Sequence, residues 1–268
     1  MPQVLAEFDD ILLEAPNWTG DDRLLLNGEG KLFSLEARRG AELREIPFEG
    51  LPEINNDHVL HPDGRRVLMT AQDGQIYAGD LAGGPVRTLT SGPGGHYLHG
   101  ISPDGRTIAF VDVIDGVGRL VLQDLESGAA SEVPVGPGHL DGPEFMPDGQ
   151  ALVLNTEMFT ECSGHAQLAR IALNADGAPG VPERLVSSDT VDWFPHVSPD
   201  GRWAAYLAYP AGTTGHPENL PVEVHVVSTD DWTAPVQTYP LHGGQGTINV
   251  ASWCPDSLRF AFVAYPVG

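Results

Sequence analysis

Short runs of apolar residues alternate with polar turns rich in glycine and proline along the whole chain. Residues 107–111 (TIAFV) and 119–124 (RLVLQD) each contain such an apolar run. Short apolar runs bounded by turn residues are typical of β-strands. The pattern predicts an all-β protein.

One turn motif recurs between these runs, a Pro-Asp-Gly sequence followed by a basic or polar residue. Proline fixes φ at the second turn position, aspartate bonds the backbone ahead of it, and glycine takes the left-handed conformation that rejoins the strands. Each copy therefore predicts a hairpin. The copies are His61–Arg65, Ser102–Arg106, Met146–Gln150, Ser198–Arg202 and Cys254–Leu258, with a degenerate first copy at Asn17–Arg23.

Six copies at intervals of about 40 to 55 residues, with several strands in each interval, are the signature of a β-propeller. We therefore expect a six-bladed β-propeller that occupies residues 1–268 as one domain. Residues Val4–Phe8 precede the first turn, and only Leu258–Tyr265 follow the last. We expect the N-terminal strand to complete the last blade, since closure removes exposed sheet edges.

Composition narrows the range of partners. Lys+Arg 14 against Asp+Glu 37 gives a net charge of −23, which repels nucleic acid and anionic membrane surfaces. The first residues lack the features of a signal peptide, and no apolar run approaches the roughly 20 residues of a membrane span. We expect a cytoplasmic protein, and the sequence leaves its oligomeric state open. The two cysteines, Cys162 and Cys254, do not suggest a disulfide framework.

Histidine, amide and carboxylate side chains gather in the segments that lead into the turns. In a propeller these segments form the innermost strands and the loops around the central channel, so residues far apart in the chain converge there. His165 and His216 lie in long insertions that could reach over the channel mouth. The residues predicted to converge from the segments themselves are Asn56, Asp57, His58, Tyr97, His99, Asp141, Glu144, Trp193, His196, Gln245 and Asn249.

Four of these residues lie three or four positions before the proline of their turn in consecutive units, namely His58, His99, Glu144 and His196. Imidazole and carboxylate donors suit a divalent cation, and we expect Mn, Ca, Zn or Fe as a cofactor, with Gln245 or Asn249 as an outer partner. The alternative interpretation is structural. A single histidine at a strand end is more often a satisfied structural residue than a ligand.

Six segments of the chain form a recognisable set, namely NNDH, HYLHGISPDG, LDGPEFMPDG, WFPHVSPDG, GHP and GGQGTINVASWCPD. They resemble segments of small, stand-alone bacterial proteins of the TolB-like β-propeller family, and the resemblance covers nearly the whole chain. It implies a six-bladed propeller without fixing a function. A more distant relative in architecture is oligogalacturonate lyase, whose metal-binding, histidine-rich channel breaks acidic sugars by β-elimination.

Two functional hypotheses follow. The first is a metal-assisted lyase or hydrolase acting on a sugar or sugar acid at the channel mouth. The second is a non-catalytic propeller that binds a protein or peptide partner on the same face, as TolB does. For the enzyme, the predicted catalytic residues are His99, His196, Asp141 and Asp57, and the predicted substrate-binding residues are Asn56, Tyr97, His165, Trp193, His216, Gln245 and Asn249.

Overall fold

Each predicted turn from Asn17 to Arg202 joins the first two strands of one sheet in the computed structural model, which describes residues 2–174 and 178–265. The turn at Ser102–Arg106 shows why. Gly105 has φ +73° and its N–H donates to the Ser102 carbonyl, while Asp104 Oδ1 accepts from the Arg106 N–H at 3.1 Å. The residue types that predicted the hairpin therefore make its hydrogen bonds.

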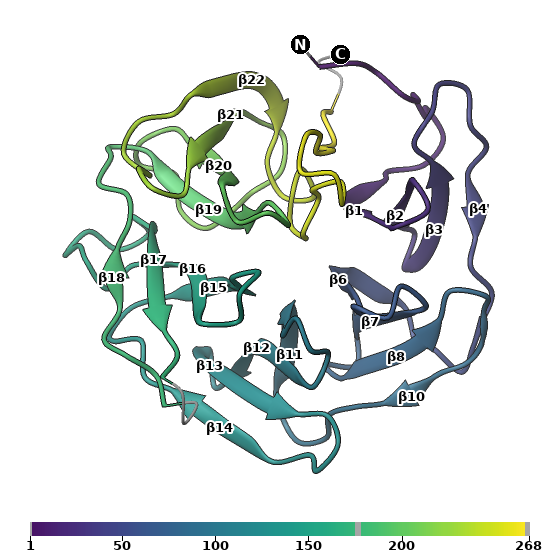
Figure 1. Ribbon diagram of the computed structural model, residues 1–268, viewed down its shortest axis with the longest axis horizontal. Coiled ribbons are helices and arrows are strands. Elements are labelled where there is room, and N and C mark those ends of the chain that lie inside the picture. The colour runs from purple at the N-terminus through teal and green to yellow at the C-terminus, as the bar shows by residue number, and fades with distance from the viewer. Residues whose placement is uncertain (1, 175–177, 266–268) are drawn as a thin grey trace.

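The strands form five antiparallel four-stranded sheets, which are the blades of a propeller (Figure 1). The described residues form no helix, and so none that could cross a membrane. Blade one consists of β1 (Glu14–Trp18), β2 (Arg23–Gly28), β3 (Lys31–Glu36) and β4 (Arg44–Glu45). Blade two consists of β6 (Ile54–Leu60), β7 (Arg66–Ala71), β8 (Ile76–Asp80) and β10 (Arg87–Thr88). Blade three consists of β11 (Gly95–Ile101), β12 (Thr107–Ile114), β13 (Val117–Asp124) and β14 (Ala130–Val133). Blade four consists of β15 (Leu140–Phe145), β16 (Ala151–Thr156), β17 (Gln167–Ala172) and β18 (Glu183–Arg184). Blade five consists of β19 (Val191–Val197), β20 (Trp203–Tyr209), β21 (Leu220–Ser228) and β22 (Gln237–Gly243). A short parallel pair, β5 (Phe48–Glu49) and β9 (Gly84–Pro85), links the rims of blades one and two.

The first strand of every blade faces the central channel, so β1, β6, β11, β15 and β19 form its wall (Figure 1). Apolar side chains fill the space between neighbouring blades. Phe145 and Leu152 of blade four, for example, pack in one cluster with Val111 and Leu120 of blade three. Apolar clusters between the blades therefore support the channel wall from behind.

The prediction of six blades is wrong, because the described residues form five four-stranded sheets. In the sixth repeat, the Cys254–Leu258 turn forms, with Ser257 at φ +60° in place of glycine, but only one isolated bridge, Trp253 to Phe260, follows from it. Residues 2–13 form no strand either. Leu5, Phe8 and Val263 pack against the same apolar cluster around Trp18, without joining their backbones into a ladder.

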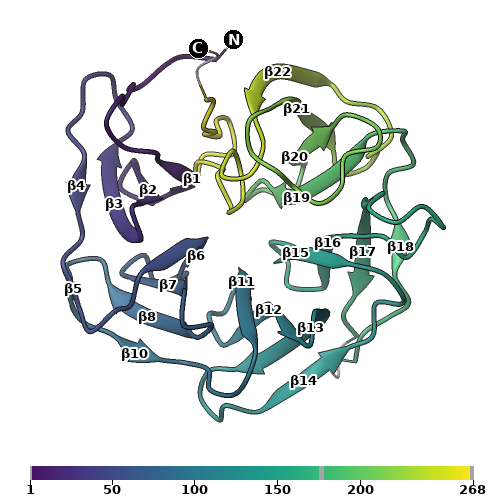
Figure 2. The same ribbon diagram turned by 180° about the vertical axis from the view of Figure 1, so that it is seen from behind.

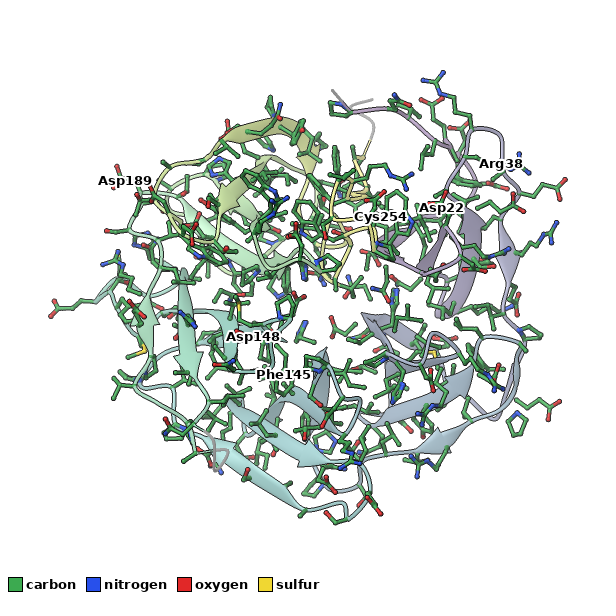
Figure 3. The ribbon with its side chains drawn as sticks, in the orientation of Figure 1. Asp22, Arg38, Phe145, Asp148, Asp189 and Cys254 are labelled. Carbon is green, nitrogen blue, oxygen red and sulfur yellow. The ribbon has the colours of Figure 1, made fainter. Side chains whose placement is uncertain are left out.

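Residues 2–13 and 249–265 nevertheless fill the gap between blades one and five (Figure 2). Arg259 links the last repeat to blade one, since its guanidinium lies 3.5 Å from Asp22 and stacks 4.9 Å from the Trp18 ring. Figure 3 shows Cys254 and Asp22 on this side of the molecule. Cys254 is buried and Cys162 is exposed, and both are free thiols. Side-chain contacts and single backbone hydrogen bonds, such as that from the Ala15 N–H to the Gly246 carbonyl, therefore close the ring in place of a completed sheet.

Asn17 is a second link across this closure. It is 3% exposed, its Nδ2 donates to the Ala251 carbonyl, and its Oδ1 accepts from the Leu60 N–H at 2.9 Å. The side chain thus joins blade one to blade two and to the last repeat.

We expect Asn17→Ala to lower the free energy of unfolding by about 2 kcal/mol, because the Ala251 carbonyl and the Leu60 N–H would lose their hydrogen-bond partner in the buried interior. Urea unfolding measures this change. The matched control is Gln237→Ala, which removes an exposed amide of β22 and should change stability by less than about 0.5 kcal/mol. Equal effects of the two substitutions would show that Asn17 does not hold the closure.

Candidate functional site

Each of the five inner strands departs from regular antiparallel pairing at one point, and these departures shape the site. Each contains a register shift of the β-bulge type, which turns side chains and increases twist. Ala15 and Phe194 take φ +55° and +53° within two of these bulges. The shifts lie between Glu14 and Asn17, Ile54 and His58, Leu98 and Gly100, Asp141 and Glu144, and Trp193 and His196.

Residues before or within the bulges line a central cavity of about 680 Å³. Its wall includes Glu14 of β1, Asp57 of β6, His99 of β11 and Asp141 of β15. Among the described residues, no lysine or arginine lines it. The predicted site residues that line the cavity are Asn56, Asp57, Tyr97, His99, Asp141, His216, Gln245 and Asn249.

His99 and Asp141 form the charged centre of the cavity. His99 Nε2 lies 2.8 Å from Asp141 Oδ1 and 4.0 Å from Asp57 Oδ1. Burial opposes charge on His99, but the two carboxylates outweigh burial and raise its pKa to about 9. Burial likewise opposes ionisation of Asp141, and His99 outweighs it and lowers the pKa to about 2. This pair is therefore ionised at neutral pH.

Asp57 behaves differently, because desolvation dominates there. Burial raises the pKa of Asp57 to about 6, although the nearby charge of His99 acts in the opposite direction. Its Oδ2 accepts from Asn55 Nδ2 at 2.6 Å. The cavity thus contains one carboxyl that titrates close to neutrality.

Aromatic and imidazole rings lie beside the charged pair of His99 and Asp141, since His216 Nε2 is 3.7 Å from Asp141 Oδ2 and the Phe194 ring is 5.9 Å from that of His99. The His216 ring lies 4.3 Å from that of Trp193 and 5.3 Å from that of Phe194, between centroids. Its Nδ1 is hydrogen-bonded to Gln245 Oε1, and burial lowers the pKa of His216. Trp193 is 1% exposed and supports His216 from behind rather than lining the cavity.

The four predicted metal ligands are not brought to one point. His196 Nδ1 lies 2.6 Å from Glu144 Oε2, and Glu144 Oε1 accepts from the Val197 N–H at 2.9 Å. His58 is fully buried, and burial lowers its pKa to about 4. No group of three or more His, Cys, Asp or Glu side chains among residues 2–174 and 178–265 is placed to hold a metal ion.

The bulges explain this separation. His58, Glu144 and His196 each come directly after the register shift of their strand, whereas His99 lies within the shift of β11. His99 therefore faces the cavity, while the other three point between blades. A similar offset from the turn, of three or four residues, did not mean a common direction.

His165 also lies away from the cavity lining. Its Nε2 is 3.1 Å from the Ser188 carbonyl and 3.0 Å from that of Thr190, so it fixes the loop before β19. Sequence reasoning missed Glu14 and Asn27, which do line the cavity. Each predicted turn is preceded, two positions before its proline (before Gly20 in the first turn), by Trp18, Leu60, Ile101 or Phe145. Glu14 stands four residues before Trp18, as Asn56, Tyr97 and Asp141 stand before Leu60, Ile101 and Phe145. That shared spacing was the available signal.

No family model matches the chain. An uncharacterized protein of Agrobacterium fabrum is 34% identical over 260 residues, which are 95% of this chain and 85% of the relative. Among solved structures, a candidate TolB from Agrobacterium tumefaciens superposes with a TM-score of 0.87 at 34% identity, covering 96% of this chain and 91% of that one.

Two further solved structures are similar at lower identity. TolB from Acinetobacter baumannii gives a TM-score of 0.58 at 18% identity, covering 87% of this chain and 52% of that one. Oligogalacturonate lyase in complex with manganese gives 0.57 at 14% identity, covering 87% and 67%. At these identities the likeness shows the fold alone.

Proposed function

This chain belongs to the TolB-like β-propeller family, and from that membership we propose that it binds a protein partner, receiving a peptide segment of the partner in the central cavity. The central cavity supports this proposal. Its volume of about 680 Å³ suits a few side chains of a peptide rather than a folded domain. Tyr97, 41% exposed, lines it and offers the kind of amphipathic ring that is enriched in protein interfaces.

Selection of a displayed random peptide library tests the proposal while the partner is still unidentified. We expect peptides that bind the protein with a defined affinity and that lose at least about tenfold, or 1.4 kcal/mol, in His216→Ala. His216 is chosen because it stands at the aromatic wall and is partly exposed. The matched control is His242→Ala on the outer strand β22, which should leave affinity unchanged.

Two results would contradict the proposal. Failure of the library to yield any binder would remove the peptide-binding function. Binders that tolerate His216→Ala as well as His242→Ala would place recognition on another surface of the propeller.

A second candidate function is acid–base chemistry on a sugar-like ligand. One observation favours it, namely that Asp57, with a pKa of about 6, and His99, with a pKa of about 9, share one cavity. Two groups whose pKa values are pushed apart are a common arrangement for a base and an acid. Turnover of a sugar acid that disappears in His99→Ala would support this candidate. Binding of peptides, without turnover of a sugar acid, would support the first.

A further inference from the structure

Glu14 lies where the ring closes, since the neighbouring Ala15 N–H donates to the Gly246 carbonyl, and its side chain lines the cavity. Asn27 Nδ2 donates to Glu14 Oε2 at 3.2 Å, and Asn56 Nδ2 donates to Oε1 at 3.3 Å. Burial raises the pKa of Glu14, and these amide donors oppose that rise. A carboxylate has about four acceptor positions, so further donors can still approach it.

The amide oxygen of Asn27 adds a hydrogen-bond acceptor to which no group among the described residues donates. It is 4% exposed, it lines the same cavity, and its Oδ1 has no hydrogen-bond partner among the described residues. Its Nδ2 is committed to Glu14, so rotating the amide would exchange one unpaired atom for another. A buried acceptor without a partner is unfavourable, and it points to a donor that binds from the cavity.

The charge of the cavity is also unbalanced. The His99 imidazole lies 2.8 Å from Asp141 and 4.0 Å from Asp57, so one cation faces two carboxylates, and Glu14 has no cationic partner among the described residues. The two are close enough for Glu14 to contribute to the raised pKa of Asp57. Among the described residues no lysine or arginine reaches the lining. We call Glu14, Asn27, Asn56 and Asp57 the acceptor pocket.

We infer that the acceptor pocket receives an organic cation, an ammonium or guanidinium group, carried by the partner's peptide segment; this inference rests on the binding function proposed above. Such a group brings positive charge and several N–H donors together, which matches two carboxylates beside an unpaired amide oxygen. A divalent metal fits less well. Asn27 and Asn56 present N–H groups to Glu14, and Asn56 Oδ1 already accepts from Gln245 Nε2 at 3.1 Å.

Small capped amino acids test the pocket directly. The probes are the N-acetyl methylamides of lysine, arginine and norleucine, titrated at pH 7.5 and low salt by calorimetry or NMR. We expect at least one cationic probe to bind about tenfold more tightly than the norleucine probe. Glu14→Gln should reduce this preference below about threefold, since it removes the charge and keeps the shape. Glu126→Gln, on an exposed turn, is the matched control and should retain the preference.

Asp57→Asn is the second variant, and it replaces Glu14→Gln as the test if circular dichroism shows that Glu14→Gln does not fold. Equal binding of charged and neutral probes would overturn the inference, as would tighter binding of calcium or manganese that displaces the cationic probe. The peptide library separates the two proposals. Binders that depend on His216 but show no enriched lysine or arginine would overturn only the cation pocket, whereas cationic probes that bind where no peptide does would overturn only the peptide function.

Discussion

Replacing Glu144 with alanine should lower the free energy of unfolding by about 3 kcal/mol, because it leaves two buried groups without their hydrogen-bond acceptor. Glu144 is 8% exposed and His196 is 3% exposed. The substitution would leave the His196 ring without its acceptor at 2.6 Å and the Val197 N–H without its acceptor at 2.9 Å. It would also leave a void next to a well-packed blade.

The effect should be large because His196 makes further hydrogen bonds to the last repeat. Its Nε2 is hydrogen-bonded to the Ile248 carbonyl, and its own carbonyl accepts from Trp253 Nε1 at 3.0 Å. Glu144 therefore supports contacts from blade four through blade five to the last repeat. In a ring that no completed sixth sheet closes, loss of such a connection weakens the closure itself.

Chemical unfolding of Glu144→Ala measures this effect, with Glu132→Ala as the control. Glu132 is exposed on β14 and lies 3.8 Å from Arg119, so its removal should cost less than about 1 kcal/mol. A loss of stability in Glu144→Ala that appears only without chelator would contradict a structural role. It would restore the metal-ligand interpretation of this residue.

The turns made most of the fold predictable. Proline, aspartate and glycine set local backbone angles, so the strand predicted over residues 107–111 begins at the same residue as β12 (Thr107–Ile114). The number of blades depends on something else. A sheet needs strands that pair, and the sixth repeat has the turn but pairs only at Trp253 and Phe260. Counting turns therefore counted one blade too many.

The site was predictable to the level of the strand but not of the side chain. The inner strands do carry the cavity, as their polar residues indicated, and Asp57, His99 and Asp141 meet there. A bulge moves a side chain by one position in the pleat. The bulge lies at a different place in each strand. His99 therefore faces the cavity and His58 does not, although both stand four residues before the proline of their turn. Nothing in the local sequence distinguishes these two positions.

Asp141→Asn should destabilise the protein by about 3 kcal/mol at pH 6, because it removes one charge of the buried pair with His99 and leaves the other. The dependence on pH follows from the two pKa values. His99 is raised from 6.5 to about 9, so its contribution is complete below pH 6.5 and is lost as the pH rises through 9. Asp141 is lowered from 3.8 to about 2, so its contribution is complete above pH 3.8 and is lost as the pH falls through 2.

The pair therefore contributes fully between about pH 4 and pH 6.5. The difference between wild type and Asp141→Asn should be largest in that window and should shrink to about 1 kcal/mol near pH 9.5, where His99 is neutral and only an uncharged hydrogen bond is at stake. Asp57, 4.0 Å from His99, is present in both proteins and keeps part of the imidazolium's stabilisation in the variant.

Urea unfolding of both proteins at a series of pH values measures this curve, and NMR titration of the His99 ring should show a lower pKa in the variant. Asp189→Asn is the control, since Asp189 lies on the outer rim of the molecule and is exposed (Figure 3). It should change stability by less than about 0.5 kcal/mol at every pH. A difference for Asp141→Asn that is flat from pH 5 to pH 9.5 would mean that the carboxylate acts through packing alone, because a charged partner must lose its effect when the imidazolium loses its proton.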